Sequence, residues 1–482
     1  MIPFESPVLT AVFPELLLAG LACVLLMLGV VGKKENYRLT ARLGVLFLLA
    51  VAAAVFCSTA AAGTSFGGMY VTDSFSTYMK LLVVTGSAVS LLMATRYLER
   101  EGIARVEYPV LMLFSTLGMM LMISANDLIS LYMALELQSL PLYVLAAIHR
   151  DNLRSTEAGL KYFVLGALSS GLLLYGASLV YGFSGATGFA QIAASIHGHL
   201  TVSLGLMTGM VLMMAGLAFK VSAVPFHMWA PDVYEGAPTS VTAFFAIAPK
   251  VAAIALITRL LMGPFGDMTE QWRQVIIVIS MASMALGGVA AIVQTNIKRL
   301  LAYSSIGHMG YALIGLAAAN STGIQGIVIY VTLYVIMSIG VFCIVLMMKR
   351  KDKMVENISD LSGLARQQPA LALAMTIMMF SMAGIPPLAG FFGKLFIFQS
   401  AVNAGLYTLA IVGVLTSVVA AYYYLRIIKV MYFEESKTGI DKAEDGGLNL
   451  ILLGASLVVM FFIVLPAPLL DGAQAAAQAF VK

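Results

Sequence analysis

Residues 216–250 read GLAFKVSAVPFHMWAPDVYEGAPTSVTAFFAIAPK. This stretch places Lys220 near the end of one apolar run and Lys250 at the centre of the next, with Pro225 between them. Proline removes a backbone hydrogen bond and clashes with the preceding helical turn. A charge at the centre of a bilayer costs about 2.5–3.5 kcal/mol on insertion scales. The stretch therefore predicts a broken membrane helix beside an intact one, with both lysines solvated inside the protein.

The rest of the chain has the composition of an integral membrane protein. Of 482 residues, 60% are hydrophobic and 11% are charged, whereas about 25% are charged in soluble domains. This excludes a soluble enzyme, a disordered protein, a disulfide scaffold and a nucleic-acid-binding protein. The three cysteines lie in apolar runs without CxxC spacing, and no two histidines are spaced as metal ligands with a carboxylate. We therefore expect no metal site.

Fourteen apolar runs are long enough to cross a membrane, since a spanning helix needs about 20 residues. Backbone amides must be paired in lipid, and long runs without alternation exclude a barrel. The predicted fold is an all-α integral membrane protein with about 14 transmembrane helices. The runs are 8–31, 39–62, 74–96, 108–125, 127–148, 156–182, 202–227, 239–261, 273–293, 300–319, 323–348, 369–402, 405–430 and 448–470.

The basic residues predict the orientation of these helices. The loops after odd-numbered runs carry most of the 28 Lys and Arg residues, among them Lys33, Lys34, Arg38, Arg42, Arg96, Arg100, Arg105, Lys298, Arg299, Lys437 and Lys442. The opposite side carries Arg259, Arg273 and Lys482. Because cytoplasmic loops are enriched in Lys and Arg, we expect a multi-pass membrane protein with both termini on the side opposite the cytoplasm, which is the periplasmic side where the membrane is a bacterial inner (cytoplasmic) membrane.

Six charged residues inside the apolar runs carry the functional signal: Glu136, Lys80, Lys161, Lys220, Lys250 and Lys394. Desolvation disfavours the charged form of such groups, so they can change protonation, and a hydrated row of them is a proton relay. Lys394 follows a second break, SMAGIPPLAGFFGK at 381–394. Transporters place ion paths beside helix breaks of this kind.

A purely structural role is the alternative to a proton relay at several of these positions. Glu136 and Lys220 are compatible with a static ion pair, and Lys394 with a simple kink. Lys161 lies near the start of its run, where its side chain can snorkel to the membrane surface. For Lys80 we expect snorkelling or a lipid-edge position, and its role stays open.

Two histidines join the relay candidates, because histidine titrates nearest to neutral pH. His227 lies two residues after Pro225, and His308 lies among small residues in SSIGHMGY. A packing or capping role is the alternative for each.

The chain also predicts an internal repeat. Runs four to eight and runs nine to thirteen each contain a broken helix as the fourth of five, and units with an odd number of helices are inverted relative to each other. The lysine precedes the proline in the first unit and follows it in the second. The predicted parts are an N-terminal three-helix segment (1–107), two inverted five-helix repeats (108–261 and 262–430) and a C-terminal helix (431–482).

Four motifs carry a resemblance to a known family: LELQSLPLYVL (135–145), residues 216–245, QTNIKRLLAYSSIGHMGY (294–311) and AGIPPLAGFFGK (383–394). The chain resembles the antiporter-like membrane subunits of respiratory complex I, the proton-pumping NADH:quinone oxidoreductase. Within them it looks like the subunit N branch, because it has the loop PDVYEGAPTSV and a lysine in the twelfth run.

The resemblance implies a role for each matching residue. Glu136 and Lys220 form a pair, Lys250 is the central relay group, and Lys394 leads to the far side; Lys161, His227 and His308 lie on the same axis. Lys80 does not belong to the family pattern. The resemblance further implies that flavin mononucleotide, iron–sulfur clusters and quinone belong to other subunits, with no cofactor in this chain.

The predicted function is therefore proton translocation through a hydrated chain of buried Lys, Glu and His, coupled to quinone reduction elsewhere in the complex. Its partners would be the lipid bilayer and other membrane-arm subunits, including a neighbouring antiporter-like subunit. The alternatives are a subunit of a multi-subunit sodium/proton antiporter or related hydrogenase, and a structural spacer that pumps nothing.

Overall fold

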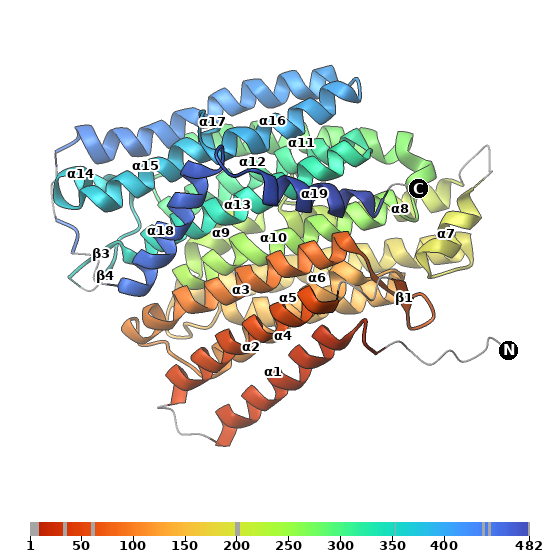
Figure 1. The fold of residues 1–482 in the computed structure, drawn as a ribbon, viewed down its shortest axis with the longest axis horizontal. Helices are drawn as coiled ribbons and strands as arrows, with labels where there is room; N and C mark the ends of the chain where they lie inside the picture. The colour runs from red at the N-terminus through yellow and green to blue at the C-terminus, as the bar shows by residue number, and fades with distance from the viewer. Residues whose placement is uncertain are drawn as a thin grey trace.

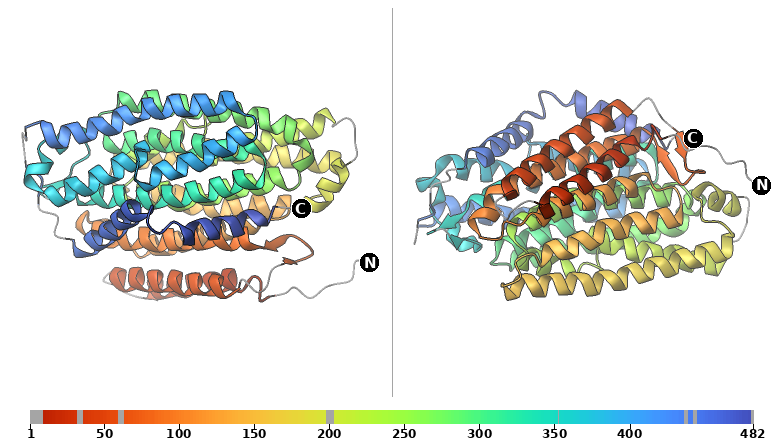
Figure 2. Two further views of the ribbon diagram at one scale, coloured as in Figure 1. Left: turned by 45° about the horizontal axis from the view of Figure 1, so that its top comes forward. Right: turned by 90° about the horizontal axis from the view of Figure 1, so that it is seen from below.

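The computed structural model describes residues 9–31, 36–58, 63–197, 203–351, 353–435, 439–441 and 445–480. Long helices lie side by side in a bundle, with α1 and α17 at opposite edges (Figures 1 and 2). The helices of the first half are α1 (Phe13–Val31), α2 (Tyr37–Cys57), α3 (Ser74–Arg100), α4 (Glu107–Ser124), α5 (Leu128–Ala146), α6 (Leu153–Ser184), α7 (Phe189–Ile196), α8 (Leu204–Val221), α9 (Trp229–Gly236) and α10 (Thr239–Met262).

The second half continues the bundle. Its helices are α11 (Thr269–Ile292), α12 (Ile297–Ala318), α13 (Ser321–Met347), α14 (Leu364–Gln367), α15 (Pro369–Ala383), α16 (Ala389–Asn403), α17 (Tyr407–Phe433), α18 (Gly446–Phe461) and α19 (Ala467–Gln478). Two antiparallel ribbons, β1 (Gly63–Ser65) with β2 (Tyr70–Thr72) and β3 (Lys349–Arg350) with β4 (Lys353–Met354), are the strands within the described ranges.

The predicted membrane helices are confirmed. In the described residues, twelve helices are long and apolar enough to cross a membrane, and they correspond to twelve of the fourteen predicted runs. The run 369–402 is divided into α15 and α16, as its glycines and prolines predict. The run 448–470 differs from the prediction of one C-terminal helix, because α18 ends at Phe461 and α19 begins after Pro466.

Polar side chains at the N-caps explain where many helices begin. An Asp or Asn oxygen accepts hydrogen bonds from backbone N–H groups of the first turn, which have no partner within the helix. The described helices capped in this way start after Asp73, Asp127, Asn152, Asn296, Asn320 and Asp445.

The centre of the bundle consists of α10, α12 and α13, whose apolar windows are almost entirely buried, whereas α1, α2, α6 and α17 expose most of theirs. Neighbouring helices approach closely where small residues meet. A Cβ on Gly176 of α6 would lie 2.6 Å from the carbonyl oxygen of Gly209 on α8. The buried centre therefore holds any polar group of α10 or α12 away from lipid.

The two predicted breaks are present. α8 ends at Val221, and Ser222 follows with a left-handed φ of 58°. α15 ends at Ala383, and Gly384 follows with a φ of 85°. Each break leaves helix-terminal carbonyls inside the bundle, where side chains of other residues must satisfy them.

Candidate functional site

The break after α8 is occupied by the side chain of Lys250, which comes from α10. Lys250 Nζ donates to the carbonyl oxygen of Val221 at 3.0 Å and to Ser222 Oγ at 2.5 Å. The residue is 1% exposed, and within the described chain no carboxylate lies within 4.0 Å of its ammonium. A lysine that the lipid would reject is thus solvated by the end of a broken helix.

Aromatic rings close the space around this ammonium. Lys250 Nζ lies 5.5 Å from the centroid of the Trp229 ring, a cation–π contact. Trp229 begins α9 and donates from Nε1 to the carbonyl oxygen of Phe219 at 2.9 Å. Tyr162 stacks on Trp229 with centroids 4.5 Å apart. Trp229 of the short helix α9 therefore covers the Lys250 ammonium on one side.

Lys220, in the last turn of α8, points toward α5. Its Nζ donates to Ser139 Oγ at 2.7 Å and to Tyr143 OH at 3.4 Å. Glu136 lies one turn before Ser139 on α5, the spacing that puts two residues on one helix face. Among described residues, no oxygen of Glu136 is within 4.0 Å of Lys220 Nζ, so the predicted pair makes no salt-bridge contact in this structure.

Glu136 is only partly buried, but one of its oxygens is enclosed without a hydrogen bond. Glu136 Oε1 has no partner among the residues that the structure covers. The Ser139 hydroxyl contacts Lys220 and the Leu135 carbonyl, and no described hydrogen bond joins it to Glu136. The hydroxyl accepts from the lysine because its own hydrogen is donated to the Leu135 carbonyl at 2.6 Å.

Lys394 occupies the second break in a similar way. Its Nζ donates to the carbonyl oxygen of Ala383, the last residue of α15, at 2.9 Å, and to Ser417 Oγ of α17 at 2.7 Å. The residue is 5% exposed. A Cβ on Gly384 would lie 2.9 Å from Lys394 Cδ, so the glycine provides room for the lysine as well as the left-handed turn.

His308 of α12 is the polar group next to Lys394. Its Nδ1 lies 2.6 Å from Tyr330 OH and its Nε2 lies 3.0 Å from Tyr424 OH. His308 and Lys394 line one small cavity, with about 10 Å³ available to the centre of a water-sized sphere. That is about the space of one water molecule, and both imidazole nitrogens already contact tyrosine hydroxyls.

Hydroxyl-bearing side chains of α9, α12 and α13 lie near one another. Tyr334 OH donates to Ser305 Oγ at 2.9 Å, whereas Tyr234 OH of α9 is enclosed without a hydrogen-bond partner among described residues. Tyr234 also contacts Trp229, with ring centroids 6.3 Å apart. Polar and aromatic groups therefore continue from the Lys250 side to α12, the helix of His308.

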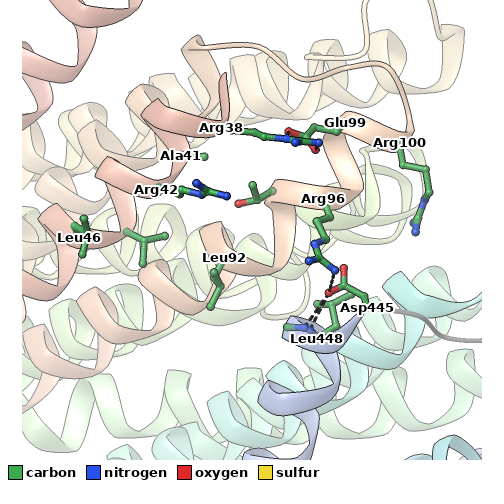
Figure 3. Close-up of a pocket in the computed structure, with 13 residues that line it drawn as sticks. Arg38, Ala41, Arg42, Leu46, Leu92, Arg96, Glu99, Arg100, Asp445 and Leu448 are labelled. Carbon is green, nitrogen blue, oxygen red and sulfur yellow. Dashed lines mark hydrogen bonds and ion pairs between the residues drawn. The ribbon is translucent and has the colours of Figure 1, made fainter. Parts of the chain in front are cut away.

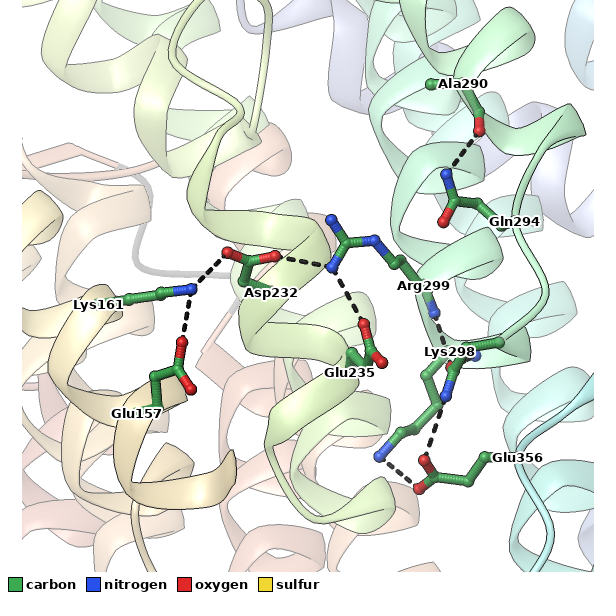
Figure 4. A network of polar contacts seen from close by, with 10 residues as sticks. Glu157, Lys161, Asp232, Glu235, Ala290, Gln294, Lys298, Arg299 and Glu356 are labelled. Carbon is green, nitrogen blue, oxygen red and sulfur yellow. Dashed lines mark hydrogen bonds and ion pairs between the residues drawn. The ribbon is translucent and has the colours of Figure 1, made fainter. Parts of the chain in front are cut away.

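Lys161 does not lie with the buried lysines. It belongs to an ion-pair network on the surface (Figure 4), where its Nζ is 2.8 Å from Asp232 Oδ2 and 2.8 Å from Glu157 Oε1. Its side chain is 41% exposed. Asp232 also pairs with Arg299 at 2.7 Å. Lys161 therefore has the surface position given above as the alternative to a relay role. The acids that pair with it are Glu157 of α6 and Asp232 of α9.

His227 lies in the turn between α8 and α9 and is partly buried. Its Nδ1 is enclosed without a hydrogen-bond partner among the described residues, and its ring interacts with the backbone of Pro225. No described hydrogen bond joins it to Lys220 or Lys250.

Lys80 corrects an expectation. It is 3% exposed, not at the lipid edge, and its Nζ lies 2.6 Å from Glu15 Oε1 and 2.6 Å from Tyr70 OH. A position near the start of its run predicts snorkelling for Lys80. Instead, the side chain is buried, and α1 supplies the carboxylate of Glu15 as its partner. Glu15, itself an acid in an apolar run, was the signal that the sequence interpretation missed.

A second buried ion pair lies close to the first. Arg259 Nη1 and Nη2 donate to Asp73 Oδ2 and Oδ1 at 2.9 and 3.0 Å, and its Nε donates to the carbonyl oxygen of Ile123. Its guanidinium also lies over the rings of Phe75 and Phe480. This pair joins α10, the N-terminus of α3 and the end of the chain. Within the described ranges, no group of three or more His, Cys, Asp or Glu residues is arranged to hold a metal ion.

The comparisons with known proteins agree with the motifs. A family model described as NADH:quinone oxidoreductase/Mrp antiporter, TM, matches residues 125–420. NADH-quinone oxidoreductase subunit N of Rhodospirillum rubrum is 58% identical over 99% of this chain and 98% of its own length. The subunit N of Paramagnetospirillum magneticum is 54% identical over 98% of this chain and 97% of its own.

Solved structures have the same architecture. A chain of respiratory complex I from Thermus thermophilus with bound aureothin superposes with a TM-score of 0.81 at 31% identity, over 96% of this chain and 99% of that one. A chain of the Mrp complex from a Dietzia species gives a TM-score of 0.84 at 23% identity over 98% of both chains, a likeness of fold alone. The chain therefore belongs to the subunit N family of NADH-quinone oxidoreductase, the antiporter-like membrane subunits of an enzyme complex.

Proposed function

We propose that this chain translocates protons across the inner membrane along the row Glu136, Lys220, Lys250, His308 and Lys394, as a membrane-arm subunit of NADH:quinone oxidoreductase. The observation that carries the proposal is the environment of Lys250. This lysine is buried at the centre of the bundle, and its hydrogen-bond acceptors are a carbonyl and a hydroxyl. Neutral acceptors allow an ammonium to give up its proton without leaving a buried carboxylate unpaired.

The environment of Lys250 differs from an ion pair in the energy that proton release requires. Two unit charges 4 Å apart interact with about 4 kcal/mol at an effective dielectric constant of 20. A lysine held by a carboxylate would have to lose that energy before it released its proton. Moving one proton against about 100 mV costs about 2.3 kcal/mol. A relay lysine with neutral partners does not add the energy of a broken ion pair to this cost of proton transfer.

The coupling is electrostatic in this proposal. A charge change in a neighbouring antiporter-like subunit, driven by quinone reduction elsewhere, alters the electrostatic interaction of Glu136 with Lys220. The proton of Lys220 then moves to Lys250 and through the hydroxyls near His308 to Lys394. Flavin mononucleotide, iron–sulfur clusters and quinone would belong to other subunits.

The remaining candidates have peripheral roles in the proposal. Lys161 and Asp232 would collect protons at the surface, since their network is exposed and acidic side chains surround the lysine. His227 would exchange protons in the turn of the first break, where its Nδ1 has no hydrogen-bond partner among described residues.

We also propose the orientation and the division of the chain. The start of α1 and the end of α19 lie at one end of the bundle, and the β3–β4 ribbon lies at the other (Figure 1). Both termini would be periplasmic, as the basic loops predict, although Lys33, Lys34, Lys437, Lys442 and Lys482 lie outside the described residues. The matching breaks after α8 and α15 support two repeats at 108–261 and 262–430, between segments 1–107 and 431–482.

The test is the variant Lys250→Met in the assembled complex, reconstituted into proteoliposomes. Proton uptake and coupled quinone reduction should fall at least tenfold, while the amount of assembled complex stays unchanged, because no carboxylate loses its partner. Lys298→Met is the matched control, since Lys298 is equally buried but pairs with Glu356 at 2.6 Å. It should lower stability rather than conduction per assembled complex. Full pumping by Lys250→Met would refute the relay and favour a spacer.

A further inference from the structure

A large pocket lies between the ends of three helices, far along the sequence from the breaks. It has a volume of about 1010 Å³ and is lined by the start of α2, the end of α3 and the start of α18 (Figure 3). None of the residues proposed for proton translocation lines it. The pocket therefore needs an explanation of its own.

Arginines form the rim of this pocket. Arg38 pairs with Glu99 at 2.6 Å and Arg96 pairs with Asp445 at 3.1 Å. Arg42 is exposed, and among described residues no carboxylate lies within 4.0 Å of its guanidinium. Figure 3 shows its guanidinium pointing across the space toward α3. A positive charge without a partner thus faces the pocket.

The floor of the pocket is apolar. Leu46 lies one turn beyond Arg42 on α2, and Leu92 lies one turn before Arg96 on α3, so both are about 6 Å deeper along the helices. They are 59% and 49% exposed, respectively. Because α2 and α3 are antiparallel, Arg42 and Arg96 lie at about the same depth along the bundle. Leu46 and Leu92 both lie one helical turn deeper. A charged rim over an apolar floor matches a phosphate headgroup joined to an acyl chain.

We propose that this pocket binds an anionic phospholipid, with its phosphate at Arg42 and an acyl chain against Leu46 and Leu92. Basic pockets between transmembrane helices bind anionic lipid headgroups, and the guanidinium fork suits phosphate oxygens. A free phosphate would satisfy the arginine but not cover the leucines. The bound lipid joins α2 and α3 to α18, so it fastens the N-terminal helices to the C-terminal part of the chain.

A local reporter makes the proposal testable in the full chain. The protein has two tryptophans, Trp229 and Trp272, both buried, so Leu46→Trp or Leu92→Trp introduces an exposed indole at the floor. Each reporter is placed in phosphatidylcholine nanodiscs that contain either brominated phosphatidylglycerol or brominated phosphatidylcholine, at equal mole fractions. Bromine quenches an indole only at close range, so the fluorescence reports which lipid occupies the pocket.

The expected result is stronger quenching by the anionic lipid in both reporters. Arg42→Gln should reduce that preference about fivefold, which corresponds to about 1 kcal/mol for one basic residue at the membrane surface. Arg42→Lys should retain most of it. Arg366→Gln is the matched control, an exposed arginine outside the pocket, and should leave the preference unchanged.

Three results would overturn the proposal. Equal quenching by the two lipids would show that the pocket does not select charge. A preference that survives Arg42→Gln would place the selection elsewhere. Loss of the preference on addition of inorganic phosphate at millimolar concentration would identify a free-phosphate site instead of a lipid site.

Discussion

Lys250 Nζ lies 3.0 Å from the carbonyl oxygen of Val221, the last residue of α8. Lys394 has the same relationship to Ala383, the last residue of α15, at 2.9 Å. The final carbonyls of a helix lack partners and carry the negative end of its dipole, so each favours an ammonium. The two halves reach this arrangement differently, since Lys250 comes from α10 and Lys394 from the helix directly after its break.

Ser139 is the closer of the two described hydrogen-bond acceptors of Lys220. Ser139→Ala removes the 2.7 Å hydrogen bond to the ammonium, and a hydrogen bond to a charged group contributes about 1.5–3 kcal/mol. We expect proton conduction by the reconstituted complex to fall about tenfold. Ser169→Ala is the control, because this buried hydroxyl donates to the Gly216 carbonyl and contacts no lysine. Equal rates in the two variants would contradict the role of Ser139.

Ser417 should matter less for Lys394 than Ser139 does for Lys220. Ser417→Ala removes one acceptor at 2.7 Å, but the Ala383 carbonyl remains. A net cost of about 1 kcal/mol corresponds to a conduction rate about fivefold lower, measured by the decay of a pH gradient in proteoliposomes. The buried Ser400, which donates to its own helix at Ile397, provides the control Ser400→Ala. An unchanged rate in Ser417→Ala would show that the carbonyl alone positions Lys394.

The buried pair of Lys80 and Glu15 should behave as a structural ion pair. Removing one partner of such a pair costs about 3–5 kcal/mol, whereas replacing both by apolar residues is often neutral. Lys80→Met should therefore destabilise the protein against denaturing detergent, and Lys80→Met with Glu15→Leu should recover most of the loss. Lys161→Met, which breaks an exposed pair, should cost less than about 1 kcal/mol. A stable Lys80→Met single variant would argue against the pair.

Asp73 should make the free energy of unfolding depend on pH in the acid range. Burial raises the pKa of Asp73, but the Arg259 guanidinium and the hydrogen bonds of Ser76 outweigh it, so the folded-state pKa lies below 3.8. A depressed carboxylate pKa contributes stability that is complete above the unfolded-state pKa and is lost as pH falls through the folded-state value. The difference in unfolding midpoint between wild type and Asp73→Asn should be constant from about pH 7 to 5.

That difference should shrink as the pH falls below about 4. Asp73→Asn leaves Arg259 buried with a weaker partner, so at neutral pH we expect a loss of about 3 kcal/mol or more. Asp151→Asn, a change at an exposed acid, should show neither effect. A pH-independent difference for Asp73→Asn would mean that Arg259 does not depress this carboxyl group.

Apolar run length, prolines and charged residues in lipid-length segments were enough to predict twelve spanning helices and both breaks, but not the division of run 448–470 into α18 and α19. Each of these signals is local: a run of about 20 apolar residues must be helical in lipid, and Pro225 and Pro386 disfavour a continuous helix. The same reasoning singled out Lys220, Lys250 and Lys394, because a buried ammonium is costly wherever its helix lies. The family followed from motifs around these residues.

The partners of these groups were decided by packing between segments far apart in the chain. Lys80 is paired because α1 brings Glu15 to it, and Lys220 of α8 hydrogen-bonds to Ser139 of α5. Lys161 lies in a surface network since α9 presents Asp232 there. Hydropathy registers the cost of burying a charge, but which atom offsets that cost depends on helix rotation and crossing, and these arise only when the whole bundle is packed.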